Sequence, residues 1–88
     1  MGPQDEIQLF LDTFGKRVKE LRNQKGLTQH DLADRSYMDI RQIQRIEAGD
    51  INTSIWNAHL IAEGLEVPID KLFLNKLEDS QSTPPQSD

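Results

Sequence analysis

One short segment of the chain carries side chains that can recognise the edges of DNA bases. At about 100° per residue, a helix over residues 40–47 separates an outward side from a core-facing side. The outward side holds Arg41, Gln44 and Arg45, with Ile40 near the exposed N-terminal end and Gln42 on the flank. Arginine and glutamine form paired hydrogen bonds with guanine and adenine, and an aliphatic side chain can meet a thymine methyl group. An ordinary solvated helix also carries Arg and Gln outside, so this segment alone does not decide the function.

No other set of residues supports catalysis or metal binding. The chain has no cysteine, and its two histidines, His30 and His59, lie on different predicted helices without carboxylates spaced to form a cluster. No glycine-rich phosphate loop follows a strand, because no strand is predicted. We therefore expect no enzyme activity, no metal site and no cofactor.

The charge distribution separates the middle of the chain from its ends. The net charge is −5, but residues 15–50 hold eight of the ten basic residues against six acids. Residues 1–14 and 51–88 are both acidic. A basic middle is compatible with a nucleic-acid partner. Asp31, Asp34, Asp39 and Asp50 are close to the candidate reading helix, so we expect modest, strongly salt-dependent affinity for DNA phosphates.

Apolar periodicity predicts an all-α fold of five helices. Residues 5–25 carry an apolar stripe at helical spacing and end at Gly26, although Asp12-Thr13 or Gly15 could split this helix. The second helix is predicted to begin at Thr28, which forms a capping box with Asp31, and to end near Arg35. The third is predicted to begin at Asp39, with Gln42 three residues on, and to end near Ala48. Thr53 or Ser54 begins the fourth, and Pro68 opens a short fifth; the inward residues of the fourth are Ile55, Ala58, Ile61, Ala62 and Leu65.

The same reading divides the chain into three parts. Residues 1–13 form an N-terminal extension of the first helix, residues 14–77 form the domain, and residues 78–88 form a tail that we expect to be disordered. The tail is acidic and polar, contains Pro84-Pro85, and has no apolar residue to bury. No apolar run approaches the ~18 residues of a membrane span. The first residues lack the basic region of a signal peptide, so we expect a soluble, cytoplasmic protein without a membrane partner.

Two spaced motifs stand in the middle of the chain: Gly26-Leu27-Thr28-Gln29-x-x-Leu32-Ala33 and, further on, Ile46-Glu47-x-Gly49. Over roughly residues 14–74 this pattern resembles the phage-repressor and Cro-type, or XRE-like, helix-turn-helix family. The resemblance implies a compact lambda-repressor-like bundle with the helix-turn-helix at the second and third helices. It also implies a bacterial or phage protein that binds double-stranded DNA sequence-specifically and regulates transcription, as a repressor or controller.

The resemblance assigns roles to individual residues. It implies base contacts from Ile40, Arg41, Gln44 and Arg45, phosphate contacts from Thr28, Gln29, Gln42 and Asn52, and a structural ion pair between Arg22 and Glu47. Two positions depart from the family pattern. Tyr37 stands where the family often has a turn glycine, and Asp39 replaces a hydroxyl cap.

The resemblance also implies pairing of two chains through the fourth helix and the following loop. Trp56 on that helix either packs against the first or fifth helix or contributes to a homodimer interface, because exposed tryptophan often anchors interfaces. An alternative function is an antitoxin or another protein-interaction module built on the same fold, with a toxin as the partner. The overall acidity of the chain favours that alternative.

Overall fold

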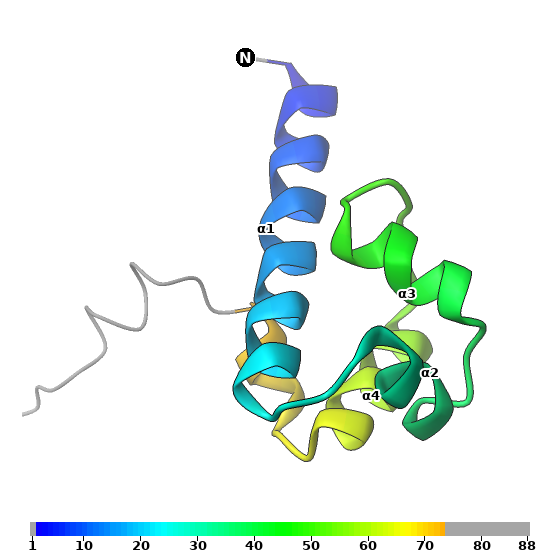
Figure 1. Ribbon diagram of the computed structural model, residues 1–88. Helices are drawn as coiled ribbons and strands as arrows, with labels where there is room; N and C mark the ends of the chain where they lie inside the picture. The colour runs from blue at the N-terminus through cyan, green and yellow to red at the C-terminus, as the bar shows by residue number, and fades with distance from the viewer. Residues whose placement is uncertain (1, 74–88) are drawn as a thin grey trace, which may run out of the picture.

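Four α-helices and one 3-10 helix follow one another in the computed structural model, which describes residues 2–73 (Figure 1). The elements are α1 (Pro3–Gln24), α2 (Gln29–Arg35), α3 (Ile40–Glu47), α4 (Ile55–Leu65) and the 3-10 helix η1 (Ile69–Phe73). No strand occurs between residues 2 and 73, so the all-α prediction is confirmed. The domain end expected at residue 77 and the tail at 78–88 lie outside the described residues.

The prediction of five α-helices is wrong in its count, because the last segment is a 3-10 helix. Pro68 stands directly before η1, and its carbonyl accepts from the Lys71 amide three residues later at 3.0 Å. A segment of five residues is too short to gain from α-helical cooperativity, and short 3-10 turns are common in such connections.

α1 runs through both places where the sequence allowed an interruption. The Thr13 hydroxyl donates to the Leu9 carbonyl at 2.8 Å, so its polar group is satisfied within the helix. Gly15 serves close packing: a Cβ atom at this position would lie 2.7 Å from the Glu47 carbonyl oxygen and even closer to that of Ile46. The glycine therefore lets α1 cross the C-terminal end of α3 at backbone contact.

The helix starts follow the predicted capping residues with one shift. Thr28 accepts from the Asp31 amide at 3.0 Å and its own amide donates to the Asp31 carboxylate at 2.9 Å, which is the expected capping box. Asp39 caps α3 by accepting from the Arg41 amide at 2.9 Å. A capping box with Gln42 would instead use the amide of Gln42, one residue later. Ser54, rather than Thr53, caps α4 through the Asn57 amide.

All four α-helices and η1 contribute to one core. The residues buried most completely are Val18, Leu32, Ile43, Ile46, Ile61, Leu65 and Leu72. One expected core position is wrong: Ile55 is 76% exposed. It is the first residue of α4, beyond the edge of the core, so helical phase alone does not bury it. None of the helices described is long and apolar enough to cross a membrane.

Candidate nucleic-acid interface

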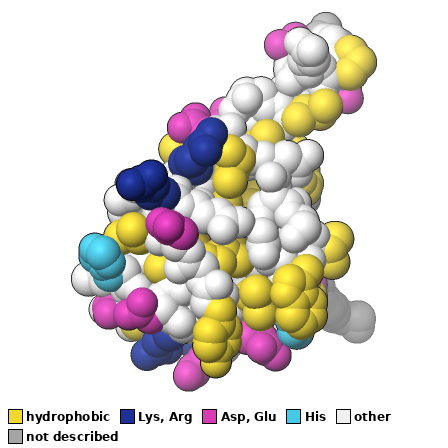
Figure 2. All heavy atoms as spheres, turned by 90° about the vertical axis from the view of Figure 1, so that its right-hand side faces the viewer, with side chains coloured by type: hydrophobic (Ala, Val, Ile, Leu, Met, Phe, Trp, Pro, Cys, Tyr) yellow, Lys and Arg dark blue, Asp and Glu magenta, His cyan; other side chains and the backbone are white. Residues whose placement is uncertain are grey.

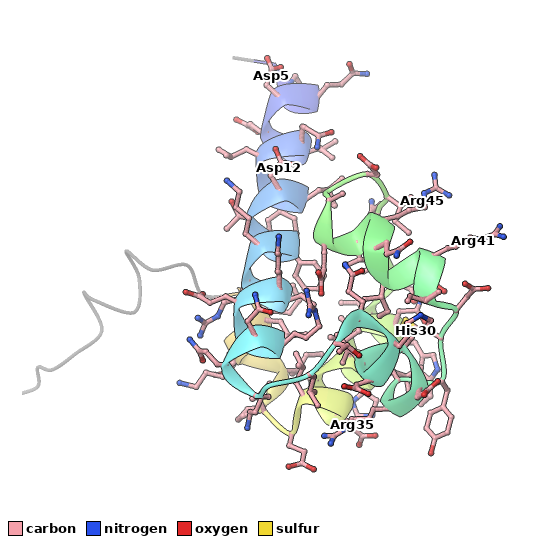
Figure 3. All side chains as sticks on the ribbon, in the orientation of Figure 1. Asp5, Asp12, His30, Arg35, Arg41 and Arg45 are labelled. Carbon is pink, nitrogen blue, oxygen red and sulfur yellow. The ribbon has the colours of Figure 1, made fainter. Side chains whose placement is uncertain are left out.

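α2 and α3 form a helix-turn-helix in which one side of α3 faces outward. The turn between them spans residues 36–39, and Tyr37 takes a left-handed backbone with φ of 56°. The side chains of Arg41, Gln44 and Arg45 are exposed. Figure 3 shows Arg41 and Arg45 pointing away from the body of the molecule on the α3 side. Ile43, Ile46 and Glu47 are buried on the opposite side of the same helix.

Two of the expected DNA-contacting residues on α3 are less accessible than the helical wheel suggests. Ile40 is half-buried and packs against the core, and Gln42 is also half-buried. The start of α3 still touches the domain, because the short turn keeps it close to α2. Any contact of Ile40 with DNA would therefore use only the outer part of its side chain.

The ion pair expected between the first and third helices is present and buried. Arg22 Nε donates to Glu47 Oε2 at 2.7 Å, and Arg22 Nη2 donates to Glu47 Oε1 at 3.0 Å. The two side chains are only 10% and 3% exposed. Hydrogen bonding to Glu47 raises the pKa of the Arg22 guanidinium, and burial opposes this. Arg22 Nη1 also donates to the Leu27 carbonyl, so the pair holds together α1, α3 and the loop between α1 and α2.

Glutamine side chains extend this pair to the outward face of α3. Gln29 Nε2 donates to Glu47 Oε1 at 3.1 Å, and Gln44 Nε2 donates to Gln29 Oε1 at 3.3 Å. A chain of hydrogen bonds thus leads from the buried Arg22 to the exposed Gln44. Sequence reasoning missed this connection because it depends on the angle between α2 and α3, which no local pattern encodes.

The remaining expected phosphate contacts lie around α3. Thr28 is exposed at the start of α2, and Asn52 is exposed in the loop after α3. Asp31 lies one turn from Thr28, and hydrogen bonds from Thr28 lower the pKa of its carboxyl group. Asp31 therefore stays negatively charged at neutral pH next to the candidate phosphate site, which weakens the local attraction for DNA.

The loop after α3 is held by the N-terminal part of α1, a contact that the sequence did not predict. Gln8 Nε2 donates to the Gly49 carbonyl at 2.9 Å and to Asp12 Oδ1 at 3.0 Å. Gly49 has φ of 75°, and a Cβ atom there would lie 3.2 Å from Asp12 Cα and closer still to its carboxylate. The only sequence signal was Gly49 itself, which was interpreted as a helix stop.

The histidines and Trp56 occupy surface positions. His30 is exposed, and His59 Nε2 lies 3.4 Å from Glu63 with its ring centroid 5.2 Å from that of Trp56. Within residues 2–73 no group of His, Cys, Asp or Glu could hold a metal ion. Trp56 is 64% exposed, so the alternative that it packs in the core is not what the structure shows.

Comparisons with known proteins agree with this geometry. Residues 18–72 match the sequence profile of a helix-turn-helix family. An uncharacterized HTH-type transcriptional regulator of Rickettsia conorii is 34% identical over 97% of this chain and 68% of its own length. A similarly named Rickettsia prowazekii protein is 33% identical, and this chain covers 65% of it.

Solved structures give the same result. The restriction-modification controller protein C.AhdI from Aeromonas hydrophila is 38% identical, with a TM-score of 0.71 over 72% of this chain and 96% of that one. The controller C.Esp1396I is also 38% identical, with a TM-score of 0.68 over 73% of this chain and 83% of its own. The chain belongs to the XRE-type helix-turn-helix family of DNA-binding transcriptional regulators.

Proposed function

We propose that this regulator binds a specific two-fold symmetric operator as a homodimer, with α3 in the major groove and α2 across the DNA backbone. The observation that carries the proposal is the division of α3 into two sides. Arg41, Gln44 and Arg45 are exposed together, whereas the opposite side is buried and fixed by Glu47. A rigidly held helix with a polar outer face is what base reading in the major groove requires.

The side chains on α3 differ in what they can read. Arg41 and Arg45 would favour guanine, and Gln44 would favour adenine, at roughly 1–3 kcal/mol of discrimination for each good paired contact. Ile40 supplies a smaller apolar contact, because half of it packs against the core. Thr28, Gln29, Gln42 and Asn52 surround this face and would contact phosphates, positioning α3 without reading sequence.

A single α3 reads only a few base pairs, so a second copy is needed for a useful operator. In this class of protein the two recognition helices contact half-sites about 34 Å apart. Trp56 supports pairing through α4, because a large aromatic side chain exposed beside Ile55 is typical of an interface anchor. Similarity to restriction-modification controllers supports a regulator of this kind.

Binding selection on randomised duplex DNA tests the proposal. The full chain is used at about 150 mM salt, and the selected sequences are retested across a salt series. We expect a two-fold symmetric motif. Arg45→Ala should relax base preference at one position of each half-site, at a cost of roughly 1–3 kcal/mol on the preferred sequence.

Lys71→Ala is the matched control, since it removes the same charge from η1, which packs against α1 and α4. The control should leave base preference unchanged. If Arg45→Ala weakens binding to all sequences equally, Arg45 contacts a phosphate instead of a base. If no motif is enriched at any salt concentration, the chain acts through a protein partner and the operator proposal is wrong.

A further inference from the structure

The start of α1 projects beyond the rest of the domain and carries an apolar stripe that stays more than half exposed among residues 2–73. The first turns of α1 extend past the other helices (Figure 1), and residues 3–13 are here called the α1 arm. Further along the same stripe, Phe14 and Val18 are buried in the core. On the arm, Ile7 is 53% exposed and Phe10 is 57% exposed. The helical pattern that builds the core therefore continues into solvent.

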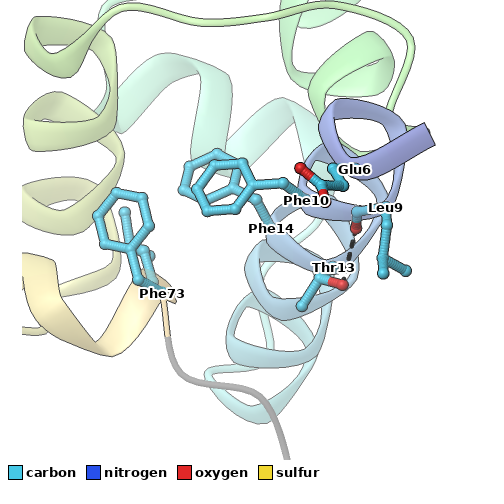
Figure 4. Close-up of a pocket in the computed structure, with 7 residues that line it drawn as sticks. Glu6, Leu9, Phe10, Thr13, Phe14 and Phe73 are labelled. Atoms are coloured by element: carbon cyan, nitrogen blue, oxygen red, sulfur yellow. Dashed lines mark hydrogen bonds between the residues drawn. The ribbon is translucent and has the colours of Figure 1, made fainter. Parts of the chain in front are cut away.

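The arm forms one wall of an apolar groove. Its lining includes Phe10 and Phe14 of α1, residues 52–54, Ile55 and Ala58 of α4, and Phe73 of η1. The ring of Phe73 lies 6.2 Å from that of Phe10 and 5.3 Å from that of Phe14, between centroids. Figure 4 shows the rings of Phe10 and Phe14 on the side of α1 that faces Phe73.

The groove and the surface next to it along the arm carry almost no charge. Among the residues that line this groove and its two neighbours along the arm, Glu6 is the only ionisable one. Two chains that each carry a net charge of −5 repel one another over most of their surface. They can approach here with little like-charge repulsion, and the lack of cations excludes nucleic acid and anionic lipid as occupants.

The exposed apolar area is large for a chain of this size. Ile7, Phe10, Ile55, Trp56 and Phe73 are here called the docking surface, and each is at least 40% exposed. Together they expose on the order of 600 Å², whereas a small monomer rarely exposes a contiguous apolar patch larger than a few hundred Å². A standard interface buries about 800 Å² per partner, so a second chain would complete it. Figure 2 shows hydrophobic side chains at the projecting end and again lower on the same edge.

We propose that a second copy of this chain docks on this surface, with each α1 arm packing against the start of α4 of the other protomer. The inference rests on the homodimer proposed above and names the part of the chain that holds it together. The surface suits a two-fold contact because it contains both a ridge, the arm, and a groove that can receive one. Gln8 fixes the arm to the Gly49 carbonyl, so the ridge is preformed before pairing.

Sedimentation equilibrium on the full chain tests the inference. Ile7→Ser and Phe10→Ser remove apolar area from the docking surface, and neither side chain is buried in the free chain. Tyr37→Ser is the control, since Tyr37 is 87% exposed in the turn between α2 and α3 and lines none of the pockets along the arm. We expect the dimer dissociation constant to rise at least about tenfold in the first two variants and to change less than about twofold in the control. Far-UV circular dichroism verifies that all three variants are folded.

The outcomes separate this inference from the proposed function. If the wild-type chain is dimeric and all three variants dimerise equally well, the arm is not part of the interface, while the homodimer and its operator stand. If the wild-type chain is monomeric at every concentration but selects a specific DNA sequence, both the docking surface and the homodimer are wrong. Base reading by α3 stands in either case.

Discussion

The ion pair between Arg22 and Glu47 predicts a large and asymmetric response to mutation. Both side chains are almost fully buried, and the guanidinium makes two hydrogen bonds to the carboxylate. Removing one partner leaves the other charge buried without compensation, which costs about 3–5 kcal/mol. At about 0.05–0.15 kcal/mol per residue, a chain of 88 residues has a free energy of unfolding of about 4–13 kcal/mol. Glu47→Leu or Arg22→Met alone should therefore remove a large part of the stability.

The double variant should behave differently from either single one. Replacing both partners by apolar side chains of similar volume removes the two buried charges together, and such replacements are often neutral or stabilising. We expect the double variant to lie within about 2 kcal/mol of the wild type, with Gln29 losing one acceptor. The cycle should then give a coupling free energy of at least about 4 kcal/mol, well above that of an exposed pair.

Urea unfolding at pH 7, followed by far-UV circular dichroism, measures all four proteins. Repeating the series in 1 M salt provides the control, because a buried pair is screened much less than an exposed one. Coupling below about 1 kcal/mol, or coupling that disappears in high salt, would refute the reasoning, since both results are the behaviour of a solvated surface pair.

Three further changes test local features of the fold. Tyr37→Gly should raise the free energy of unfolding by up to about 1 kcal/mol, because Tyr37 has φ of 56° and is 87% exposed. A lower free energy of unfolding in urea would contradict this. Gly15→Ala should lower it by about 1–3 kcal/mol, since the new methyl group meets the α3 backbone, and an unchanged melting temperature would show that α1 and α3 can separate freely. Asp31→Asn should destabilise more at pH 7 than at pH 2. The pKa of Asp31 is lowered from 3.8 by Thr28, so its contribution is present above that value and is lost as pH falls through the folded pKa. Equal destabilisation at both pH values would exclude the charge as the cause.

Features that depend on local sequence were predicted well. The capping box of Thr28 and Asp31, the end of α1 before Gly26 and the end of α3 before Gly49 all follow from side chains within one turn of the boundary. The outward position of Arg41 also follows from helical phase alone, because a short helix against one core has only one inner side.

Features that depend on distant parts of the chain were not predictable in the same way. Helical phase puts Phe10 and Ile55 on inner faces, but burial also requires the core to extend that far, and it ends before both of them. Gly15 could mark a break or a close approach, and only the α3 backbone beside it decides between them. Ile40 was expected outside, yet the tight turn keeps it against the core.

The hydrogen-bond chain from Arg22 through Glu47 and Gln29 to Gln44 constrains how a protein like this one can acquire a new operator. Changing Gln44 also disturbs Gln29 and, through it, a carboxylate that helps the domain fold. Within residues 2–73, the side chains of Arg41 and Arg45 make no such connection to the core. New DNA specificities should therefore arise most readily by substitution at these two arginines, and a library built to redirect the protein should vary them first while keeping the glutamines fixed.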